Sequence, residues 1–313
     1  MKKFALTGVS GFVAERHLEA IRSTGNELVA AMDVSDSAGI LDSYFPCAEF
    51  FTGETEFEKF LRLYKKEKGL DYLSVCTPNH LHQQNVRSGL DLGVSVICEK
   101  PLVLEPDDAE ELLRIEQRSD GRVFNILQLR HHPDILALKK NTLLTTGSKY
   151  DIDLAYVTPR GKWYHHSWKG DEARSGGIAT NIGIHFFDML IWIYGPVKDC
   201  IIHMHTDQRA AGFLELEHAR VRWFLSINED DLPAENKPGR TALRSIMVNG
   251  DVLDFSSGFA QLHNKNYEAI LSGRGCGIQD VMPSIELAHQ IRTKDPVGKK
   301  AEWHPMASGY FNE

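Results

Sequence analysis

The sequence lacks the residue patterns that mark several classes of protein. Its five cysteines are widely spaced and form no C-x-x-C pair, which argues against a disulfide framework or a zinc site and favours reduced thiols. The formal net charge of −8 argues against a nucleic-acid-binding protein, which needs basic residues to neutralise phosphates. No uninterrupted apolar run approaches the ~20 residues that span a bilayer. No cleavable signal peptide is visible. We therefore expect a cytoplasmic protein without a bound metal and without nucleic-acid or membrane partners.

The first part of the chain alternates strand-like runs with amphipathic helical patterns. A length of 313 residues is enough for two domains with full cores. The alternation predicts a doubly wound Rossmann domain over residues 1–122. Between residues 197 and 255, strand-like runs follow one another without intervening helices. This succession predicts a second α+β domain, residues 123–313, with a large, mostly antiparallel open sheet.

A glycine turn follows the first strand-like run. Gly8, Gly11 and Ala14 form a G-x-x-G-x-x-A pattern, a shifted form of the dinucleotide-binding fingerprint. Small residues there let the backbone approach a pyrophosphate, and the next helix presents its N-terminus to that group. Many such turns are rich in glycine for steric reasons alone. We expect cofactor contacts at Gly8, Ser10, Gly11, Phe12 and Val13.

An acidic residue ends the second strand-like run. Asp33 lies twenty-two residues after Gly11, where a carboxylate accepts hydrogen bonds from the adenosine ribose and repels a 2′-phosphate. This placement favours NAD over NADP. The alternative is an exposed aspartate in a turn.

Three further polar segments follow strand-like runs, and in an open parallel sheet these ends lie at the ligand-binding edge. Glu99 and Lys100 follow a buried apolar run, and Pro101 ends it because proline has no N–H to donate. We expect Lys100 to lie where cofactor and substrate meet. The cofactor contacts expected at this edge are Thr77, Asn79, His82, Glu99, Lys100 and Gln128. Asn79 could instead cap the following helix.

Together with residues 181–185, these motifs resemble the glucose–fructose oxidoreductase and inositol dehydrogenase superfamily over nearly the whole chain. Residues 125–132, 160–164, 167–171 and 219–226 resemble the bacterial dehydrogenases that oxidise C3 of UDP-N-acetylglucosaminuronic acid, a step in making diamino sugar acids for O-antigen lipopolysaccharide. The resemblance implies NAD as cofactor, a UDP-sugar substrate, a homotetramer and a cis peptide bond between Lys100 and Pro101. Some relatives also reoxidise the cofactor in place with a 2-oxo acid.

The catalytic candidates are Lys100, Asn181 and His185. Oxidation of a secondary alcohol needs a hydride acceptor and a base for the hydroxyl proton. Asn181 and His185 are four residues apart and would share one face of a helix. We assign Lys100 as proton acceptor and His185 as the group that orients the hydroxyl, with the reverse assignment left open. The superfamily has Asp at the position of Asn181, so we do not expect a charged Asp–His relay here.

A cationic loop interleaved with large rings precedes Asn181. Arginine grips a carboxylate bidentately, and aromatic faces suit a uracil or sugar ring. The expected substrate contacts are Arg160, Lys162, Trp163, Tyr164, Trp168, Lys169, Asn181 and His185. The loop could instead form an oligomer contact. Another sugar or polyol dehydrogenase of the same fold, or a nicotinamide-binding regulator, remains the alternative function.

Overall fold

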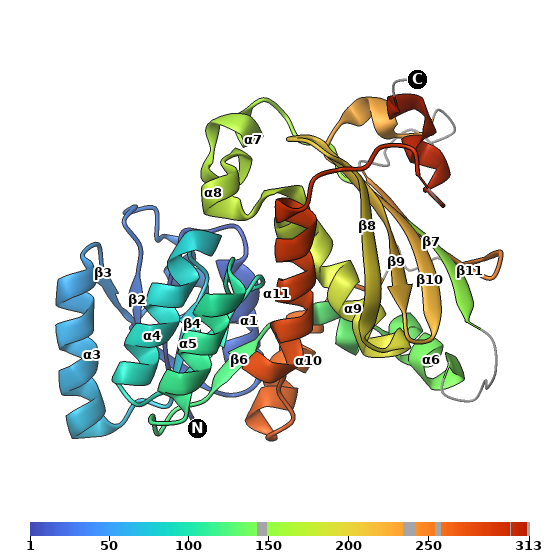
Figure 1. The fold of residues 1–313 in the computed structure, drawn as a ribbon. Coiled ribbons are helices and arrows are strands. Elements are labelled where there is room, and N and C mark those ends of the chain that lie inside the picture. The colour runs from blue at the N-terminus through green and yellow to red at the C-terminus, as the bar shows by residue number, and fades with distance from the viewer. Residues whose placement is uncertain (143–148, 234–241, 254–257, 301, 312–313) are drawn as a thin grey trace. The chain divides into compact units, whose positions relative to one another are not determined.

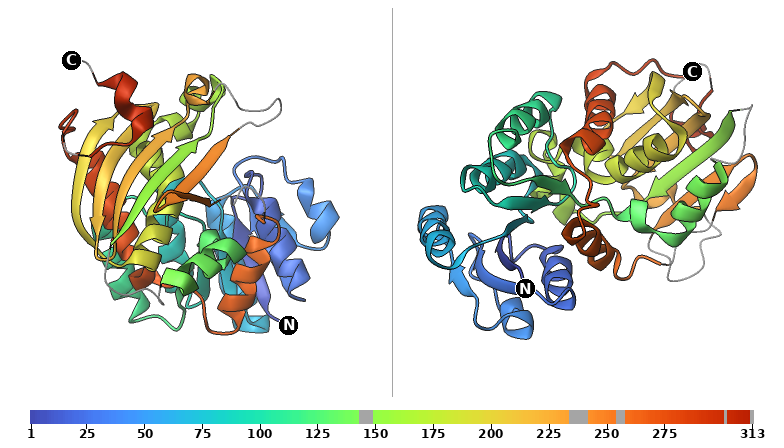
Figure 2. Two further views of the ribbon diagram at one scale, coloured as in Figure 1. Left: turned by 90° about the vertical axis from the view of Figure 1, so that its right-hand side faces the viewer. Right: turned by 90° about the horizontal axis from the view of Figure 1, so that it is seen from below.

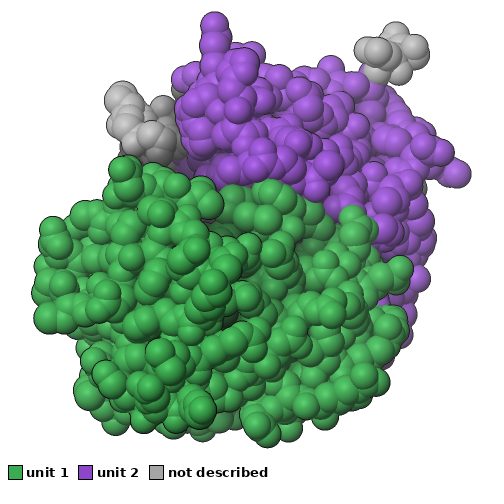
Figure 3. Space-filling view, turned by 90° about the vertical axis from the view of Figure 1, so that its left-hand side faces the viewer, with its two compact units in different colours: residues 1–131, 261–282 green, residues 132–260, 283–313 purple. Residues whose placement is uncertain are grey.

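The computed structural model describes residues 1–142, 149–233, 242–253, 258–300 and 302–311, which divide between two compact units (Figure 3). Unit 1 comprises residues 1–131 and 261–282, and unit 2 comprises residues 132–260 and 283–313. We expected the first domain to end at residue 122. It continues to His131 because the strand at Val123–Asn125 pairs with its neighbour Ser95–Cys98. A segment late in the chain also returns to unit 1, which the sequence boundary did not anticipate.

Unit 1 is built on a six-stranded parallel sheet, here called sheet A (Figure 1). The strand order is β3-β2-β1-β4-β5-β6. The order reverses between β1 and β4, which is the switch point at which doubly wound sheets bind ligands. The predicted Rossmann architecture is confirmed. The strands are β1 (Lys3–Thr7), β2 (Glu27–Met32), β3 (Glu49–Phe51), β4 (Tyr72–Val75), β5 (Ser95–Cys98) and β6 (Val123–Asn125).

Helix α1 (Ala14–Ser23) packs one face into the core of unit 1. It buries Leu18 and Ile21 on the same stripe as His17, and the rings of His17 and Tyr267 pack edge to face with centroids 5.6 Å apart. Tyr267 belongs to α10, which lies beside α1 although it follows in sequence some 240 residues later (Figure 1). The helices of unit 1 are α1 (Ala14–Ser23), α2 (Ile40–Tyr44), α3 (Glu54–Lys68), α4 (His82–Asp91), α5 (Pro106–Glu116) and α10 (Leu262–Leu271), with short 3₁₀ turns at Asn79–Leu81 and Gln128–His131.

Unit 2 is built on a second six-stranded sheet, sheet B, in the order β12-β11-β7-β10-β9-β8. Only β7 and β10 pair in parallel among its described strands, so the predicted mostly antiparallel sheet is confirmed. The last expected strand-like run reached residue 255, whereas β12 ends at Leu253 and residues 254–257 lie outside the described residues. The strands are β7 (Tyr150–Val157), β8 (Val197–His205), β9 (Arg209–Leu216), β10 (Ala219–Ser226), β11 (Leu243–Val248) and β12 (Asp251–Leu253).

Helix α9 covers one face of sheet B (Figure 2). Phe187 of α9 packs edge to face on Trp223 of β10 with ring centroids 5.3 Å apart. The helical elements of this unit are α6 (Pro133–Thr142), α7 (Trp163–His166), α8 (Glu172–Ser175), a π-helix (Ala179–Gly183) and α9 (Ile184–Tyr194), with 3₁₀ turns at Trp168–Gly170, Glu229–Asp231 and Pro305–Tyr310. Helix α11 (Ile278–Thr293) begins in unit 1 and continues into unit 2.

One stretch of unit 2 is apolar enough to be compared with a membrane span. Residues Glu172–Tyr194 pass by length and composition, although polar residues such as Asn181 and His185 interrupt the apolar run. Of its apolar window, 72% is buried. A buried helix of this kind serves as the core of unit 2.

Candidate active site

The glycine turn at the end of β1 is shaped by a close backbone approach. Gly8 has φ +83°, and a Cβ there would lie 2.6 Å from the carbonyl carbon of Cys76. Ser10 donates its backbone N–H to Asp33 Oδ2 at 3.0 Å, and Ser35 donates its own to Asp33 Oδ1 at 2.9 Å. Asp33 follows β2 as predicted, and its carboxylate braces the turn through these two bonds.

The segment after β4 is held by its own side chains. Thr77 Oγ1 donates to Asn85 Oδ1 at 2.7 Å. Asn79 is buried and is the first residue of a 3₁₀ turn whose N-cap is Pro78, and the N-cap of α4 is Leu81. Both ring nitrogens of His82 lie against backbone carbonyls, Nδ1 2.6 Å from Pro101 O and Nε2 2.8 Å from Thr77 O. The ring of His82 therefore joins two loops of the ligand-binding edge.

Lys100 follows β5 at the carboxyl edge of sheet A and is half-buried. Its peptide bond to Pro101 is cis, as the resemblance implied. Asn125, at the end of β6, donates its amide to the carbonyls of Cys98 at 2.9 Å and Glu99 at 3.1 Å. The backbone that leads into Lys100 is thus fixed from the neighbouring strand.

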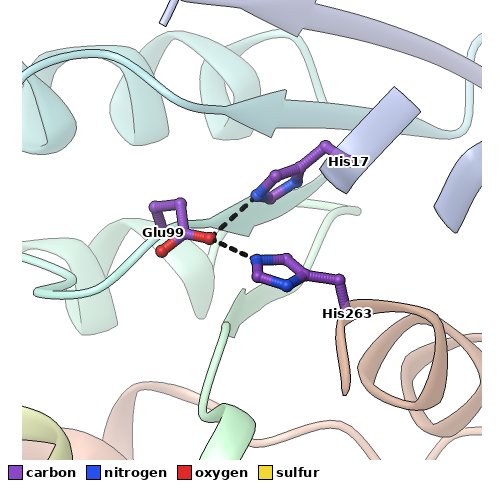
Figure 4. A group of neighbouring side chains, drawn as sticks. All are labelled: His17, Glu99 and His263. Atoms are coloured by element: carbon purple, nitrogen blue, oxygen red, sulfur yellow. Dashed lines mark hydrogen bonds and ion pairs between the residues drawn. The ribbon is translucent and has the colours of Figure 1, made fainter. Parts of the chain in front are cut away.

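Glu99 is the centre of a buried cluster (Figure 4). Its Oε1 lies 3.0 Å from His17 Nε2 and 2.8 Å from His263 Nε2. Burial raises the pKa of Glu99, but the hydrogen bonds from both rings outweigh it and hold that pKa well below its usual range. Burial in turn lowers the pKa of His17. Glu99 is therefore a carboxylate that accepts hydrogen bonds from two imidazoles.

In unit 2 the catalytic candidates lie where the helix changes its winding. Asn181 belongs to the π-helix, and His185 belongs to the first turn of α9, with both side chains half-buried. We expected a regular α-helix through both residues. The π-helical turn is wider, which is a feature common at functional sites. Asn181 Nδ2 donates to the hydroxyl of Tyr164 at 2.8 Å.

The loop before Asn181 brings cations and rings together. Lys169 Nζ lies 5.5 Å from the ring centroid of Trp163 and 5.6 Å from that of Trp168. Burial lowers the pKa of Lys169, and the positive charge of Arg160 lowers it further. Tyr164 is 2% exposed, while Arg160 and Lys162 are exposed. Two neighbouring cations that repel each other favour an anionic ligand.

The structure places the predicted residues in two groups. Those of the glycine turn and the three strand ends lie in unit 1, and those of residues 160–185 lie in unit 2. Gln128 contributes to the Glu99 cluster, with its Nε2 3.2 Å from His263 Nε2. The sequence analysis singled out neither His263 nor His17. The only signal for His17 was a polar residue on the buried stripe of α1.

Two comparisons with known proteins decide the family. Residues 2–126 match the oxidoreductase family with an NAD-binding Rossmann fold, and residues 148–231 match its C-terminal alpha/beta domain. The WlbA (WbpB) dehydrogenase of Thermus thermophilus, solved with NAD and alpha-ketoglutarate, has a TM-score of 0.94 and 46% identity over 97% of this chain and 99% of that one. The chain belongs to this oxidoreductase family.

A second structure of the Thermus enzyme, in complex with NAD and UDP-GlcNAcA, has a TM-score of 0.94 and 45% identity over the same shares of the two chains. Among curated proteins, a putative UDP-kanosamine synthase oxidoreductase subunit of Amycolatopsis mediterranei is 26% identical over 189 residues, which are 60% of this chain and 50% of that protein. The chain spans at most about half the length of the first curated relatives that it matches.

The residues of unit 1 fit the NAD that the family binds. A side chain at Gly8 would collide with the backbone after β4, so the turn is open only because glycine occupies it. Asp33 stands at the end of β2, the position of the ribose-binding acid in this fold. The chain is an NAD-dependent oxidoreductase.

Proposed function

We propose that this protein oxidises the C3 hydroxyl of UDP-N-acetylglucosaminuronic acid to the 3-keto sugar. The observation that carries the proposal is the 45% identity, over 97% of the chain, to the Thermus dehydrogenase bound to NAD and UDP-GlcNAcA. The described residues include the groups that this reaction needs: unit 1 has a dinucleotide turn and a lysine at the carboxyl edge of sheet A, and unit 2 has a cationic loop.

The cofactor would be held by unit 1. The backbone of the turn at Gly8 and Gly11 would accommodate the pyrophosphate, and Asp33 would accept hydrogen bonds from the adenosine ribose. Bound NAD supplies the hydride acceptor. Ser10, Phe12, Val13, Thr77, Asn79, His82, Glu99 and Gln128 remain the other predicted contacts, with His82 and Glu99 already engaged by protein groups.

The proton of the C3 hydroxyl would pass to Lys100. Lys100 is half-buried and follows β5 at the carboxyl edge of sheet A, where ligands bind in this fold, and an amine so placed can act as a base. His185 would orient the hydroxyl, and Asn181 would fix the neighbouring turn through Tyr164. Because Asn181 is an amide, no carboxylate backs His185 at this position.

The anionic parts of the substrate would bind the loop of unit 2. Arg160 and Lys162 are exposed cations, and Lys169 lies beside two indole rings. These groups suit a diphosphate or a sugar carboxylate together with the planar uracil. Tyr164 is too buried to offer its ring face and would act through Asn181.

A 2-oxo acid is a second substrate that the comparisons favour, because the Thermus enzyme was also solved with alpha-ketoglutarate. NADH and one proton would reduce the keto group of 2-oxoglutarate to the hydroxyl of 2-hydroxyglutarate and regenerate NAD. The two electrons removed from the sugar would thus leave as the hydroxy acid.

The assembly and setting follow from the same resemblance. We propose a cytoplasmic homotetramer that acts in O-antigen biosynthesis. The face of sheet B away from α9 supports an interface, because it has a hollow of about 1040 Å³ lined by charged residues such as Arg220, Arg222 and Asp153.

The experiment is to follow the reduced-nicotinamide absorbance of the purified protein with each candidate sugar. UDP-N-acetylglucosaminuronic acid should produce the band, and adding 2-oxoglutarate should remove it. UDP-N-acetylglucosamine and free inositol are the comparison substrates. A stronger signal with inositol would make the protein a polyol dehydrogenase, and no signal with any alcohol would favour a regulator.

A further inference from the structure

The directions of the hydrogen bonds around Glu99 follow from its charge. A carboxylate only accepts, so the Nε2 atoms of both His17 and His263 must carry protons. His17 Nδ1, 2.7 Å from the hydroxyl of Tyr267, is then the acceptor of the tyrosine proton. Tyr267 accepts in turn from Ser74 at 2.8 Å. Every bond in this chain points toward Glu99, which fixes its carboxylate in one position.

On the other side of Lys100, the carbonyl of Pro101 is held by His82. The ring is 1% exposed and lies between this carbonyl and that of Thr77. Carbonyl oxygens only accept, so the nitrogen that holds the carbonyl of Pro101, Nδ1 at 2.6 Å, is the one that carries the proton. Burial lowers the pKa of His82, and the charge of Lys100 lowers it further. The hydrogen bonds to the two carbonyls and the charge of Glu99 oppose that lowering without reversing it.

We propose that His17, His82 and His263 are positioning residues for Lys100. His17 and His263 hold Glu99, the residue before Lys100. His82 holds Pro101, the residue after it, so buried rings fix both ends of this short segment. The inference rests on the proposed function, in which Lys100 accepts the substrate proton. Proton transfer depends steeply on the position of the base, and a misplacement of about 1 Å can cost ~100-fold in rate.

The same three ligand atoms could in principle hold a metal, since those of His17, Glu99 and His263 lie within 4.8 Å of one another. A hydrogen-bonded network is favoured over a metal because His17 Nδ1 accepts from Tyr267, whose hydroxyl accepts in turn from Ser74. Metal analysis of the purified protein separates the two readings. A stoichiometric divalent ion would overturn the proposed role of His17 and His263.

The kinetic test uses His82→Asn and His263→Asn, each alone and combined with Lys100→Met. Each single variant should lower kcat about 10- to 100-fold and change the Kd for NAD less than about threefold. In the Lys100→Met background the same substitutions should have almost no further effect on kcat. An equal further loss in that background would overturn the proposal, because the histidines would then act independently of Lys100. His203→Asn is the matched control, since His203 is a buried histidine of unit 2 with a ring nitrogen 2.8 Å from the carbonyl of Lys300.

A second measurement separates the failure of this inference from the failure of the proposed function. Hydrogen–deuterium exchange of the peptide spanning residues 98–104 should be faster in His82→Asn and His263→Asn than in wild type or His203→Asn. If Lys100→Met keeps wild-type kcat, Lys100 is not the base of the proposed reaction, while the exchange result still decides the positioning role. If wild type does not oxidise the sugar at all, the proposed function fails. Unchanged exchange in both folded variants would overturn that role whatever the activity. In wild type, ¹⁵N spectra should show Nδ1 of His82 protonated at neutral pH, and an unprotonated Nδ1 would overturn its hold on the carbonyl of Pro101.

Discussion

At the scale of single residues, Gly8 shows how one side-chain atom decides whether the cofactor turn can form. Two separate constraints act on it, a positive φ of +83° and a backbone neighbour 2.6 Å from where Cβ would be. The first constraint is shared with Gly25, which has φ +72° but no atom within 4 Å of its would-be Cβ. The two glycines therefore separate conformational strain from steric collision.

Gly8→Ala is expected to destabilise the protein more than Gly25→Ala and to abolish NAD binding. Gly25→Ala should cost about 1–2 kcal/mol of unfolding free energy, the cost of a left-handed backbone for an L-residue. Gly8→Ala adds the displacement of the segment after β4. Urea unfolding and calorimetric titration with NAD measure the two effects. Equal stability loss and equal NAD affinity in both variants would contradict this account of the turn.

Lys100→Met is expected to lower kcat by ~10²–10⁴-fold, the contribution of a positioned base, with NAD affinity nearly unchanged. Methionine keeps the length and apolar stem of the side chain but cannot take a proton. Steady-state kinetics and NAD titration are the measurements. A wild-type kcat would exclude Lys100 as the base, and loss of NAD affinity alone would make it a cofactor contact.

At the scale of elements, alternation and spacing predicted what depends on neighbours in the sequence. Lys162, Trp163, Trp168 and Lys169 were grouped from their interleaving, and the structure places Lys169 beside both indoles. The π-helical turn at Asn181 could not be predicted because its extra residue per turn is set by packing against β10. A Cβ at Gly183 would lie 2.6 Å from Leu225 Cδ1, so the turn is pressed against that strand.

The loop between β7 and the π-helix is where we expect substrate selection. Arg160→Ala should raise KM for the uronate ~10- to 150-fold, which corresponds to the roughly 1.5–3 kcal/mol of a charge-assisted hydrogen bond. If Arg160 contacts the carboxylate, wild type should use UDP-N-acetylglucosamine poorly and the variant should discriminate less. Lys198→Ala, an exposed cation on β8, is the control. Equal weakening for both sugars would assign Arg160 to the diphosphate, and no change would remove the loop from substrate binding.

At the scale of the whole molecule, the sequence predicted both sheets but not that the chain returns to unit 1 at α10. Strand patterns are local, whereas the pairing of His17 with His263 joins positions 246 residues apart through one carboxylate. The return of α10 to unit 1 leaves no local mark in the sequence, because its buried face is an ordinary amphipathic pattern. This long-range contact makes His263 a member of the Glu99 cluster. The sequence analysis did not predict it, because the two residues are far apart in the chain.

The stability of unit 2 in acid can be tested through one buried histidine, His304. Burial lowers the pKa of His304 to about 4, while an unfolded histidine titrates near about 6.5. The unfolded state therefore binds this proton first, so the free energy of unfolding is full above about pH 6.5 and falls by up to about 3 kcal/mol as the pH drops toward 4. His304 Nδ1 also accepts the backbone N–H of Met306 at 3.2 Å.

His304→Asn keeps an acceptor for that cap and removes the titration, so it should flatten the pH dependence of unit 2 over this range. All five tryptophans of the sequence lie in unit 2, so tryptophan fluorescence during urea unfolding reports on that unit alone. His218→Asn, at an exposed histidine, should keep the wild-type slope. The pH dependence of the unfolding free energy should differ between the two variants, because only His304→Asn removes a ring that the folded state shields from water. If His304→Asn loses stability on acidification as steeply as wild type, other groups carry the acid sensitivity of unit 2.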